Sequence, residues 1–400
     1  MYGFITIHSD LIFEIIEHPY FQRLRRIRQL GLTSLVYPGA LHTRFHHAIG
    51  SMHLMYEALT NLRTKGVEIS DDELEASMIA ILLHDIGHGP FSHTLEFSLL
   101  KDVSHEQISL LFFEKLNELM GGALDMARRI FSGQYERRFF HELVSSQLDI
   151  DRLDYLKRDS FFTGVSEGSI GSERIINMLN VKDDQIVVEE KGIYSIEHFL
   201  SARRLMYWQV YLHKTSVSAE EMLIQMIKRA KKLTQKGHEV VATPALRIFL
   251  ERNIEWGDFM DDPHILEVFS LLDDSDLWGS MKFWREHEDF ALSKLSKSLL
   301  DRDLFKVILS NDRIDAEIIN RKSEVIRTHF GVSNKQAAYL MGNGKISNSA
   351  YMRSGQKIKI LTKKQQIVDI EEATDLPNIK AMSKIVNKYF FCWYQVDRLD

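Results

Sequence analysis

A histidine-rich segment that follows an apolar run is the strongest chemical signal in the sequence. His84–His93 holds three histidines and an aspartate, and its glycines and proline end the helix that the preceding apolar residues predict. Imidazole nitrogens and carboxylate oxygens together suit Mn, Fe, Mg or Zn. Adjacent helix residues splay by about 100°, so His84 and Asp85 can share an ion only at a helix end. The segment therefore predicts part of a metal site whose other ligands come from elsewhere in the chain.

Two further segments offer those ligands. Upstream, Arg44–Gly50 places two adjacent histidines at the start of a predicted helix. Downstream, Leu148–Asp159 repeats Asp151, Tyr155 and Asp159 at intervals of four residues, which places all three on one helix face. On spacing alone, a solvated face with local Asp–Arg pairs explains those aspartates about equally well.

Together these segments resemble a known family. His47, His84-Asp85 and Asp151 resemble the ordered H…HD…D signature of HD-domain metal-dependent phosphohydrolases. The longer segments are similar to those of the deoxynucleoside triphosphate triphosphohydrolases, the branch that includes the sterile-alpha-motif/HD enzyme and its bacterial relatives. These segments are Phe21–Gly31, Arg44–Gly50, His84–His93, His105-Glu106 and Asp151–Asp159. The resemblance covers residues 2–235 strongly and later residues weakly, and it includes no sterile-alpha-motif domain.

The resemblance implies one divalent metal ion per site, with Mn or Fe favoured over Mg or Zn. Its ligands would be His47, His84, Asp85 and Asp151, and the two carboxylates would offset the charge of the ion. In the family, water attacks the α-phosphorus of a dNTP, which releases a deoxynucleoside and triphosphate. We therefore expect metal-dependent dNTP hydrolysis, with dGTP as a candidate preferred substrate and a dNTP as a candidate activator.

The same resemblance assigns the proton transfer and the phosphate contacts. His93 would protonate the leaving 5′-oxygen, with Glu96 beside it where the family commonly has Asp. His88, His105 and Glu106 would line the phosphate site, although each could instead hold a hydrogen-bonded structural position. A triphosphate also needs cations, and three arginines match phosphate-facing positions: Arg44, Arg152 and Arg203.

Another group matches the residues that hold the deoxyribose. Gln29 and Asp159 would hydrogen-bond the 3′-hydroxyl. Tyr155 would pack beneath the sugar and leave no room for a 2′-hydroxyl, which would exclude ribonucleotides. Tyr207 and Tyr211 are expected near the base, although a helix rich in arginines and aromatic residues is often only an interface.

A run of arginines near the N-terminus allows two interpretations. Arg23, Arg25, Arg26 and Arg28 could form the solvated face of a helix predicted over Tyr20–Leu30. Alternatively, Arg25 could belong to an effector site, since several family members bind activating nucleotides near this segment. An Asn-Asp-Pro-like element that contributes to such contacts in relatives would precede residue 2, so activation through that element is left open.

The wider pattern predicts a mainly α-helical HD fold with a small C-terminal α/β lobe. Helices are predicted over Tyr20–Leu30, Phe45–Thr64, Ser70–Asp85, His105–Met120, Phe140–Lys157, Tyr194–Lys232 and Asp315–Phe330. Strands are predicted over Leu304–Leu309, Ile358–Leu361, Ile367–Ile370 and Tyr389–Tyr394, with a hairpin loop over Thr362–Gln366 and a flexible segment over Gly342–Ser349. We divide the chain into an HD phosphohydrolase domain (1–235), a helical extension (236–300) and a C-terminal α/β appendage (301–400).

Composition limits the class of protein further. A net charge of −6 over 400 residues argues against nucleic acid as a partner, although a local basic patch could still act. The single cysteine, Cys392, excludes an internal disulfide, and the apolar runs are far shorter than the roughly 20 residues of a membrane span. These features favour a cytoplasmic protein. On family grounds we expect a homo-oligomer, a dimer or tetramer. Two other functions stay open: an HD phosphohydrolase of nucleoside monophosphates or cyclic nucleotides, and a non-catalytic nucleotide sensor.

Overall fold

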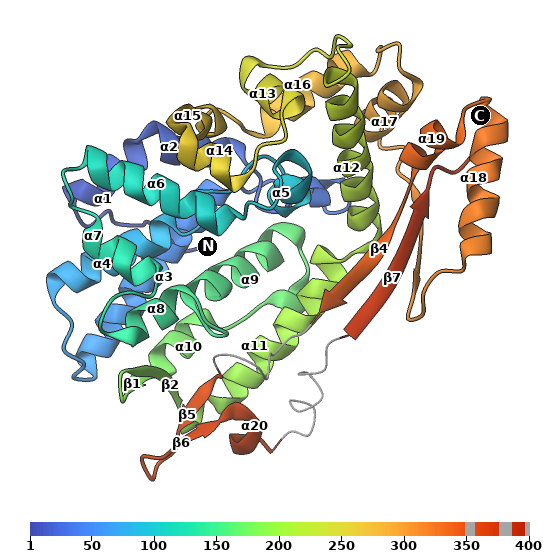
Figure 1. Ribbon diagram of the computed structural model, residues 1–400. Coiled ribbons are helices and arrows are strands. Elements are labelled where there is room, and N and C mark those ends of the chain that lie inside the picture. The colour runs from blue at the N-terminus through green and yellow to red at the C-terminus, as the bar shows by residue number, and fades with distance from the viewer. Residues whose placement is uncertain (349–356, 376–385, 397–400) are drawn as a thin grey trace.

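Helices make up most of the protein, and two small sheets are built largely from its C-terminal part (Figure 1). The computed structural model describes residues 1–348, 357–375 and 386–396. The mainly helical fold predicted from the sequence is confirmed. In those described ranges, every helix is too short or too polar to cross a membrane.

Apart from two short strands described below, the first 235 residues form α-helices joined by loops and short turns. The α-helices are α1 (Asp10–Glu17), α2 (Pro19–Gln22), α3 (Arg44–Thr64), α4 (Asp71–Leu83), α5 (His93–Leu99), α6 (His105–Leu119), α7 (Asp125–Phe131), α8 (Arg138–Val144), α9 (Ile150–Thr163), α10 (Ser172–Met178), α11 (Ile193–Met206) and α12 (Lys214–Thr234). The 3-10 turns are η1 (Arg23–Arg26), η2 (Gly31–Leu35), η3 (Ser166–Gly168) and η4 (Glu190–Gly192), and η5 (Tyr207–Tyr211) is a π-helical turn.

The later residues continue with shorter helices. These are α13 (Pro244–Glu251), α14 (Trp256–Asp261), α15 (Pro263–Ser270), α16 (Asp274–Trp284), α17 (Phe290–Leu300), α18 (Ala316–Phe330), α19 (Asn334–Ala337) with the 3-10 turn η6 (Ala338–Leu340), and α20 (Ile370–Ala373). The helix predicted over Asp315–Phe330 is confirmed as α18, which Asp315 caps.

Three helices meet where the sequence places its chemistry. α3 packs against both α4 and α9. The predicted capping box of Ser70 and Glu73 fixes the start of α4. The Asp149 carboxylate accepts a hydrogen bond from the backbone N–H of Arg152 and fixes the start of α9. As a result, the first turn of α3, the last turn of α4 and the first turn of α9 lie together.

The helix predicted over Tyr20–Leu30 is wrong. The chain turns there through α2 and η1, is extended at Ile27, and turns again before η2. Arg23 is fully buried, and its guanidinium donates to the carbonyl oxygens of Ile86 and His88, each at 2.8 Å. The solvated-face interpretation is therefore wrong for Arg23, because tertiary hydrogen bonds, which a sequence pattern does not reveal, determine its position.

Two longer predicted helices are interrupted. The prediction over Phe140–Lys157 is wrong as one helix, since α8 ends at Val144 and α9 begins at Ile150. The prediction over Tyr194–Lys232 is likewise broken, by η5 and a bend before α12. The second interruption lies beside the cavity described below, since Tyr207 and Tyr211 line it. Single π-helical turns are frequent at functional sites in proteins.

The strands form two sheets. One has the order β1 (Leu179–Lys182), β2 (Gln185–Glu189), β5 (Lys359–Leu361) and β6 (Ile367–Asp369), and the other has the order β3 (Lys306–Ser310), β7 (Val386–Trp393) and β4 (Met341–Asn348). Neighbours pair antiparallel except β2 and β5, which are parallel. The strands of the predicted appendage therefore divide between two sheets, one of which is shared with the helical part of the chain.

The segment predicted to be flexible, Gly342–Ser349, is mostly the strand β4, so that prediction is wrong for residues 342–348; residue 349 lies outside the described ranges. Pairing along the whole of β7 supplies the backbone hydrogen bonds that hold this Gly- and Ser-rich strand extended. The hairpin loop predicted over Thr362–Gln366 is confirmed, because the Thr362 N–H donates to the Gln366 carbonyl at 2.9 Å.

Candidate active site

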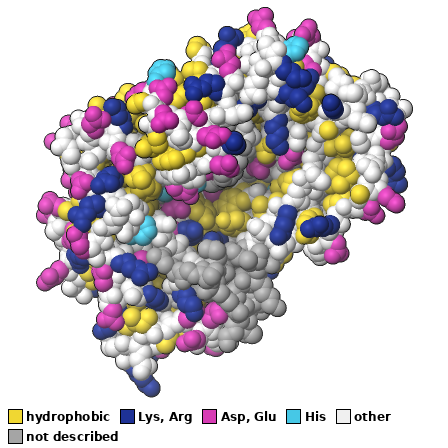
Figure 2. Space-filling model, in the orientation of Figure 1, with side chains coloured by type: hydrophobic (Ala, Val, Ile, Leu, Met, Phe, Trp, Pro, Cys, Tyr) yellow, Lys and Arg dark blue, Asp and Glu magenta, His cyan; other side chains and the backbone are white. Residues whose placement is uncertain are grey.

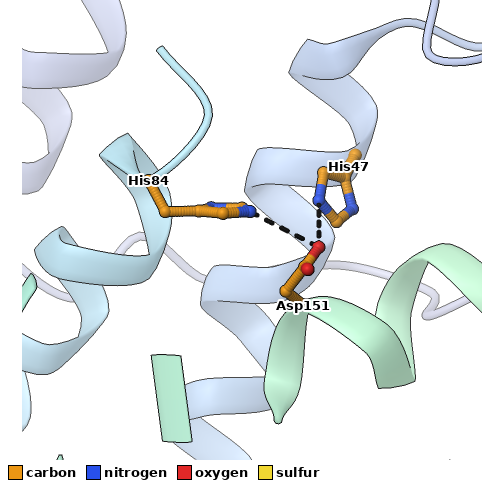
Figure 3. Close-up of side chains that lie close together, drawn as sticks. All are labelled: His47, His84 and Asp151. Atoms are coloured by element: carbon orange, nitrogen blue, oxygen red, sulfur yellow. Dashed lines mark ion pairs between the residues drawn. The ribbon is translucent and has the colours of Figure 1, made fainter. Parts of the chain in front are cut away.

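Two histidines and an aspartate from three different helices point at one another (Figure 3). His47 comes from the first turn of α3, His84 ends α4, and Asp151 begins α9. The Oδ1 atom of Asp151 lies 3.0 Å from Nε2 of His47 and 3.4 Å from Nε2 of His84.

Asp85 completes this cluster. Its Oδ2 lies 3.7 Å from Nε2 of His47, and its Oδ1 lies 3.5 Å from Nε2 of His84. The four residues predicted as metal ligands thus converge, and we refer to His47, His84, Asp85 and Asp151 as the metal cluster. The helix end brings His84 and Asp85 toward the same centre, as the sequence analysis required.

The ring orientations of the two histidines suit a metal ion. His47 Nδ1 lies 2.8 Å from Oδ2 of Asp154, and His84 Nδ1 lies 2.6 Å from the carbonyl oxygen of Ile81. A proton on each Nδ1 donates to these acceptors, which leaves the Nε2 lone pairs facing the cluster. Both Nε2 atoms are buried, and neither finds a hydrogen bond of good geometry among the described residues. These orphaned nitrogens fit ligands of a divalent ion.

The charges around the cluster also favour a bound cation. Burial lowers the pKa of His47, but the nearby Asp151 and Asp154 carboxylates outweigh burial and raise that pKa to about 10. Burial likewise opposes ionisation of Asp151, whose pKa His47 and His84 nevertheless hold well below its usual range. The cluster therefore attracts positive charge strongly, and a bound metal ion would compete with protons for it.

Asp154 and Arg158 support His47 from behind. The Arg158 guanidinium donates two 2.8 Å hydrogen bonds to the Asp154 carboxylate. A Cβ atom on Gly50 would lie 2.0 Å from this guanidinium and 2.2 Å from Oδ1 of Asp154. Only glycine at position 50 leaves room for the pair, so Gly50, Asp154 and Arg158 together fix the orientation of His47.

The residues predicted to contact phosphate lie next to the cluster. Arg44 is buried; its guanidinium hydrogen-bonds Asp85 and donates to Oγ of Ser92 at 2.9 Å. The rings of His88 and His105 stack 3.8 Å apart. Burial, reinforced by the positive charge of Arg44, holds the pKa of His88 well below its usual range, so this ring is neutral.

Glu96 positions His105. One Glu96 oxygen lies 2.9 Å from Nδ1 of His105 and accepts from its backbone N–H at 2.8 Å. Glu106 lies 3.4 Å from Nε2 of the same ring. His93 begins α5, but its side chain lies outside the described part of the structure, so its predicted role as proton donor stays a prediction.

The residues predicted to hold the sugar meet at the far end of α9. Asp159 accepts a 2.8 Å hydrogen bond from the Tyr211 hydroxyl, and its other oxygen lies 2.7 Å from Nε2 of His42. Tyr155, one turn earlier, packs edge-on against Tyr211 with ring centres 6.1 Å apart. The Oε1 atom of Gln29 is buried and lacks a partner within the described residues.

One cavity of about 630 Å³ joins these parts. Twelve of the predicted site residues line it: Gln29, Arg44, Asp85, His88, His105, Glu106, Asp151, Arg152, Tyr155, Asp159, Tyr207 and Tyr211. In the orientation shared by Figures 1 and 2, a hollow with hydrophobic side chains opens between α5, α9 and α12. The cavity is large enough for a small-molecule ligand.

Besides the two histidines of the metal cluster, three predicted residues with described side chains lie outside the cavity lining. Glu96 acts through His105, and Arg203 is buried near Tyr155, with two of its nitrogens lacking a described partner. Arg25 donates to Gln22 and lies 3.6 Å above the Phe45 ring. The effector role predicted for Arg25 stays a prediction.

Comparison with known proteins gives the family. Residues 44–159 match the HD domain, and residues 170–243 match the HD associated region. A phosphohydrolase from Bacteroides thetaiotaomicron, known from a crystal structure, is 51% identical, and the comparison covers 98% of each chain with a TM-score of 0.95. The uncharacterized protein YwfO of Bacillus subtilis is 34% identical over 319 residues, 78% of this chain and 71% of YwfO. The chain belongs to the HD-domain phosphohydrolases.

This HD phosphohydrolase also has a more distant relative with a named activity. The deoxynucleoside triphosphate triphosphohydrolase SAMHD1 homolog of Dictyostelium discoideum is 29% identical over 328 residues. These residues are 76% of this chain and 59% of that protein, so the chain spans less than two thirds of its length. The matched HD domain contains the whole metal cluster, and the HD associated region contains Tyr207, Tyr211 and α12.

Sequence reasoning about this HD phosphohydrolase missed several residues around the site. Asp154 and Arg158 stood inside the Asp151–Asp159 motif, and their four-residue spacing was a usable signal for an ion pair. Asp274 carried no local signal: it comes from α16, and its carboxylate accepts from the backbone N–H groups of Arg28 and Phe91. Glu220 likewise had no motif context, although it lines the cavity.

Proposed function

We propose that this HD phosphohydrolase hydrolyses deoxynucleoside triphosphates to deoxynucleoside and triphosphate. The observation that carries the proposal is a single cavity that runs from the metal cluster to the Gln29, Tyr155 and Asp159 group. Asp151 and Asp159 are eight residues apart on α9, about 12 Å along the helix axis. That separation leaves room for phosphate near one residue and deoxyribose near the other.

The metal cluster would hold one divalent ion, with Mn or Fe favoured. When bound, such an ion supplies positive charge that makes a nearby water more acidic and polarises a phosphoryl oxygen. Arg44 and Arg152 would offset further phosphate charge; Arg152 is partly buried beside Asp149 and lines the cavity. Neutral His88 would donate a hydrogen bond to phosphate rather than a full charge.

The reaction breaks the bond between the α-phosphorus and the 5′-oxygen of the sugar. Water supplies the new oxygen on phosphorus, and the leaving 5′-oxygen needs a proton. His93 is the proposed donor on family resemblance. The hydrogen-bonded pair of Glu96 and His105 lies close behind it in the chain and would hold the phosphate-side wall in place.

The sugar group supports a deoxynucleotide over other phosphate esters. Asp159 is held by Tyr211 and His42, so its carboxylate is fixed in position to accept a hydrogen bond from a 3′-hydroxyl. Tyr155 stands between this aspartate and the metal cluster and would occupy the space that a 2′-hydroxyl needs.

The test is a product assay. The purified protein is incubated with Mn²⁺ and each of the four dNTPs, with nucleoside monophosphates and cyclic nucleotides in parallel, and products are separated by ion chromatography. We expect tripolyphosphate and deoxynucleoside in equal amounts, and none from Asp151→Ala. Release of orthophosphate or pyrophosphate alone, or turnover of only the monophosphates or cyclic nucleotides, would contradict the proposal.

A further inference from the structure

The turn that leads into α5 has a strained backbone beside the cavity. Phe91 and Ser92 have φ angles of 54° and 51°, in the left-handed region that residues with a side chain rarely adopt. Both residues are buried, and both line the cavity. Such a conformation is unfavourable and persists only where surrounding groups hold it. The contacts of this turn therefore determine how Ser92 faces its neighbours.

The Ser92 hydroxyl connects Arg44 to a neighbouring backbone segment. It accepts a hydrogen bond from Nε of Arg44 at 2.9 Å and donates to the carbonyl oxygen of Arg28, 3.4 Å away. Another nitrogen of the Arg44 guanidinium hydrogen-bonds Asp85 of the metal cluster. Two hydrogen bonds from different nitrogens thus fix the orientation of this guanidinium at the cavity wall.

Asp274 holds the backbone on both sides of the Ser92 hydroxyl. Its Oδ1 accepts from the backbone N–H of Phe91 at 2.8 Å, and its Oδ2 accepts from that of Arg28 at 2.9 Å. Asp274 is 4% exposed and lies in the first turn of α16. The same helix holds Phe91 a second time, because the Phe91 ring packs edge-on against Trp278 with ring centres 5.7 Å apart. α16 therefore anchors the strained turn through a carboxylate and an aromatic contact.

The segment that Asp274 holds at Arg28 also carries the backbone of Arg44. Arg28 and Thr43 form an antiparallel bridge, and the N–H of Arg44 donates to the carbonyl oxygen of Ile27 at 2.9 Å. Asp274 itself lies outside the cavity lining. One buried carboxylate thus ties together the backbone of Arg44 and the hydroxyl that orients the Arg44 side chain.

We propose that Asp274 is a positioning residue of the active site, which holds Ser92 so that the Arg44 guanidinium faces phosphate. This inference rests on the proposed function, because that function takes Arg44 to offset phosphate charge. A guanidinium presents its N–H donors in a fixed planar fork. If the Ser92 hydroxyl moved, Arg44 would keep its charge and its contact with Asp85, but its remaining donors would point away from phosphate.

The test measures binding of tripolyphosphate to the Mn²⁺-loaded protein by calorimetry. The measurement is made at pH 8, where Asp274, with a pKa of about 6, is ionised. In Asp274→Asn one oxygen still accepts, but the amide nitrogen faces a backbone N–H, so one of the two hydrogen bonds is lost. We expect the affinity for tripolyphosphate to fall by about 10- to 100-fold, the range for a lost charge-assisted hydrogen bond.

A double-mutant cycle shows whether Asp274 acts through Ser92. Ser92→Ala removes the hydroxyl that accepts from Arg44. If Asp274 acts by placing that hydroxyl, the double variant should bind tripolyphosphate about as weakly as the weaker of the two single variants. Losses from two independent structural defects would multiply instead.

Two further variants keep the result interpretable. Asp276→Asn is the matched control on the same helix: Asp276 accepts from the Asp273 N–H and the Thr243 hydroxyl, and its loss should leave tripolyphosphate binding unchanged. Asp274→Glu keeps both acceptor oxygens on a longer stem and should recover part of the lost affinity. If Asp274→Asn fails to fold, Asp274→Glu replaces it in the cycle, with a smaller loss and the same non-additivity expected.

Unchanged binding in Asp274→Asn, an equal loss in Asp276→Asn, or losses that multiply in the double variant would overturn the inference and leave the proposed function standing. Absence of tripolyphosphate binding by the wild type would overturn the inference as well. If the wild type binds tripolyphosphate but hydrolyses no dNTP, the proposed function fails, and the cycle still decides whether Asp274 positions Arg44 for phosphate.

Discussion

The Nδ1 atom of His47 lies 2.8 Å from Oδ2 of Asp154, on the side of the ring opposite the metal cluster. Asp154 is fully buried and is itself held by the Arg158 guanidinium. This contact fixes which nitrogen of His47 carries the proton, and it leaves Nε2 as the ligand. Asp154 would therefore support a metal ion held by the cluster without being one of its ligands.

Asp154→Asn should weaken Mn²⁺ binding by about 10- to 100-fold, the usual effect of losing a charged partner behind a ligating histidine. The amide keeps the shape of the side chain but removes the charge that makes His47 a strong ligand. Calorimetric titration of the metal-free protein measures the change. Asp125→Asn, an exposed aspartate paired with Arg128, is the control; equal Mn²⁺ affinities in both variants would contradict the role of Asp154.

Gly50→Ala tests the support of His47 by placing a methyl group against Asp154 and Arg158. Its Cβ would sit 2.0 Å from the Arg158 guanidinium and 2.2 Å from Oδ1 of Asp154, so one of them must move. We expect the free energy of unfolding to fall by roughly 1–3 kcal/mol, as in other overpacked interiors, together with weaker Mn²⁺ binding. Urea unfolding measures the first effect.

Gly279→Ala provides the matched comparison for this substitution. Gly279 lies within α16, and a Cβ there meets nothing within 4 Å. Alanine at position 279 should leave the free energy of unfolding of the protein unchanged or raise it by up to about 1 kcal/mol. If both variants behave alike, the tight fit at Gly50 has no energetic consequence.

The four residues that the sequence analysis grouped as metal ligands do converge in the structure, whereas several of the elements around them were predicted wrongly. His84 and Asp85 stood out because they begin a histidine-rich, glycine-rich segment after an apolar helix, and the family resemblance then supplied the ligand set. Arg23 was misjudged because its burial depends on carbonyl oxygens of Ile86 and His88, more than 60 residues away in the chain. Its position is set by tertiary hydrogen bonds that no local pattern encodes.

The same limit applies to β4 and Glu220. Glycine and serine in residues 342–348 indicate a loop by propensity, but pairing with β7 overrides that preference. Glu220 and Glu221 are indistinguishable in sequence. Only the direction of α12 places one in the cavity and the other against β4.

Asp274 should make stability depend on pH. Burial raises its pKa to about 6, from an ordinary value of 3.8, although the backbone N–H groups of Arg28 and Phe91 donate to it. A raised carboxyl pKa means that the folded state binds the proton more tightly than the unfolded state. The stabilisation is therefore complete below about pH 4 and is lost as the pH rises to about 6.

Asp274→Asn isolates this effect, since asparagine stays neutral throughout. Between about pH 4 and pH 6, the wild type should lose about 3 kcal/mol of unfolding free energy relative to the variant. Urea unfolding of both proteins at half-unit pH intervals measures this difference in unfolding free energy. Parallel curves would show that Asp274 ionises freely in the folded protein.

Tyr155 should determine whether ribonucleotides are rejected. Its ring lines the cavity one turn before Asp159 and packs edge-on against Tyr211. Tyr155→Ala removes the ring and opens space for a 2′-hydroxyl, so the ratio of kcat/KM for GTP over dGTP should rise by at least about tenfold. Total activity should fall as well, because the sugar loses a packing surface.

Tyr155→Phe keeps the ring and removes only the hydroxyl, so it distinguishes a steric effect from a hydrogen bond. If the exclusion is steric, the phenylalanine variant keeps the discrimination of the wild type, and only the alanine variant accepts GTP. If both variants accept GTP, the hydroxyl of Tyr155 provides the selectivity through a hydrogen bond. If neither does, another residue excludes the 2′-hydroxyl, and the assignment of Tyr155 to sugar discrimination is wrong.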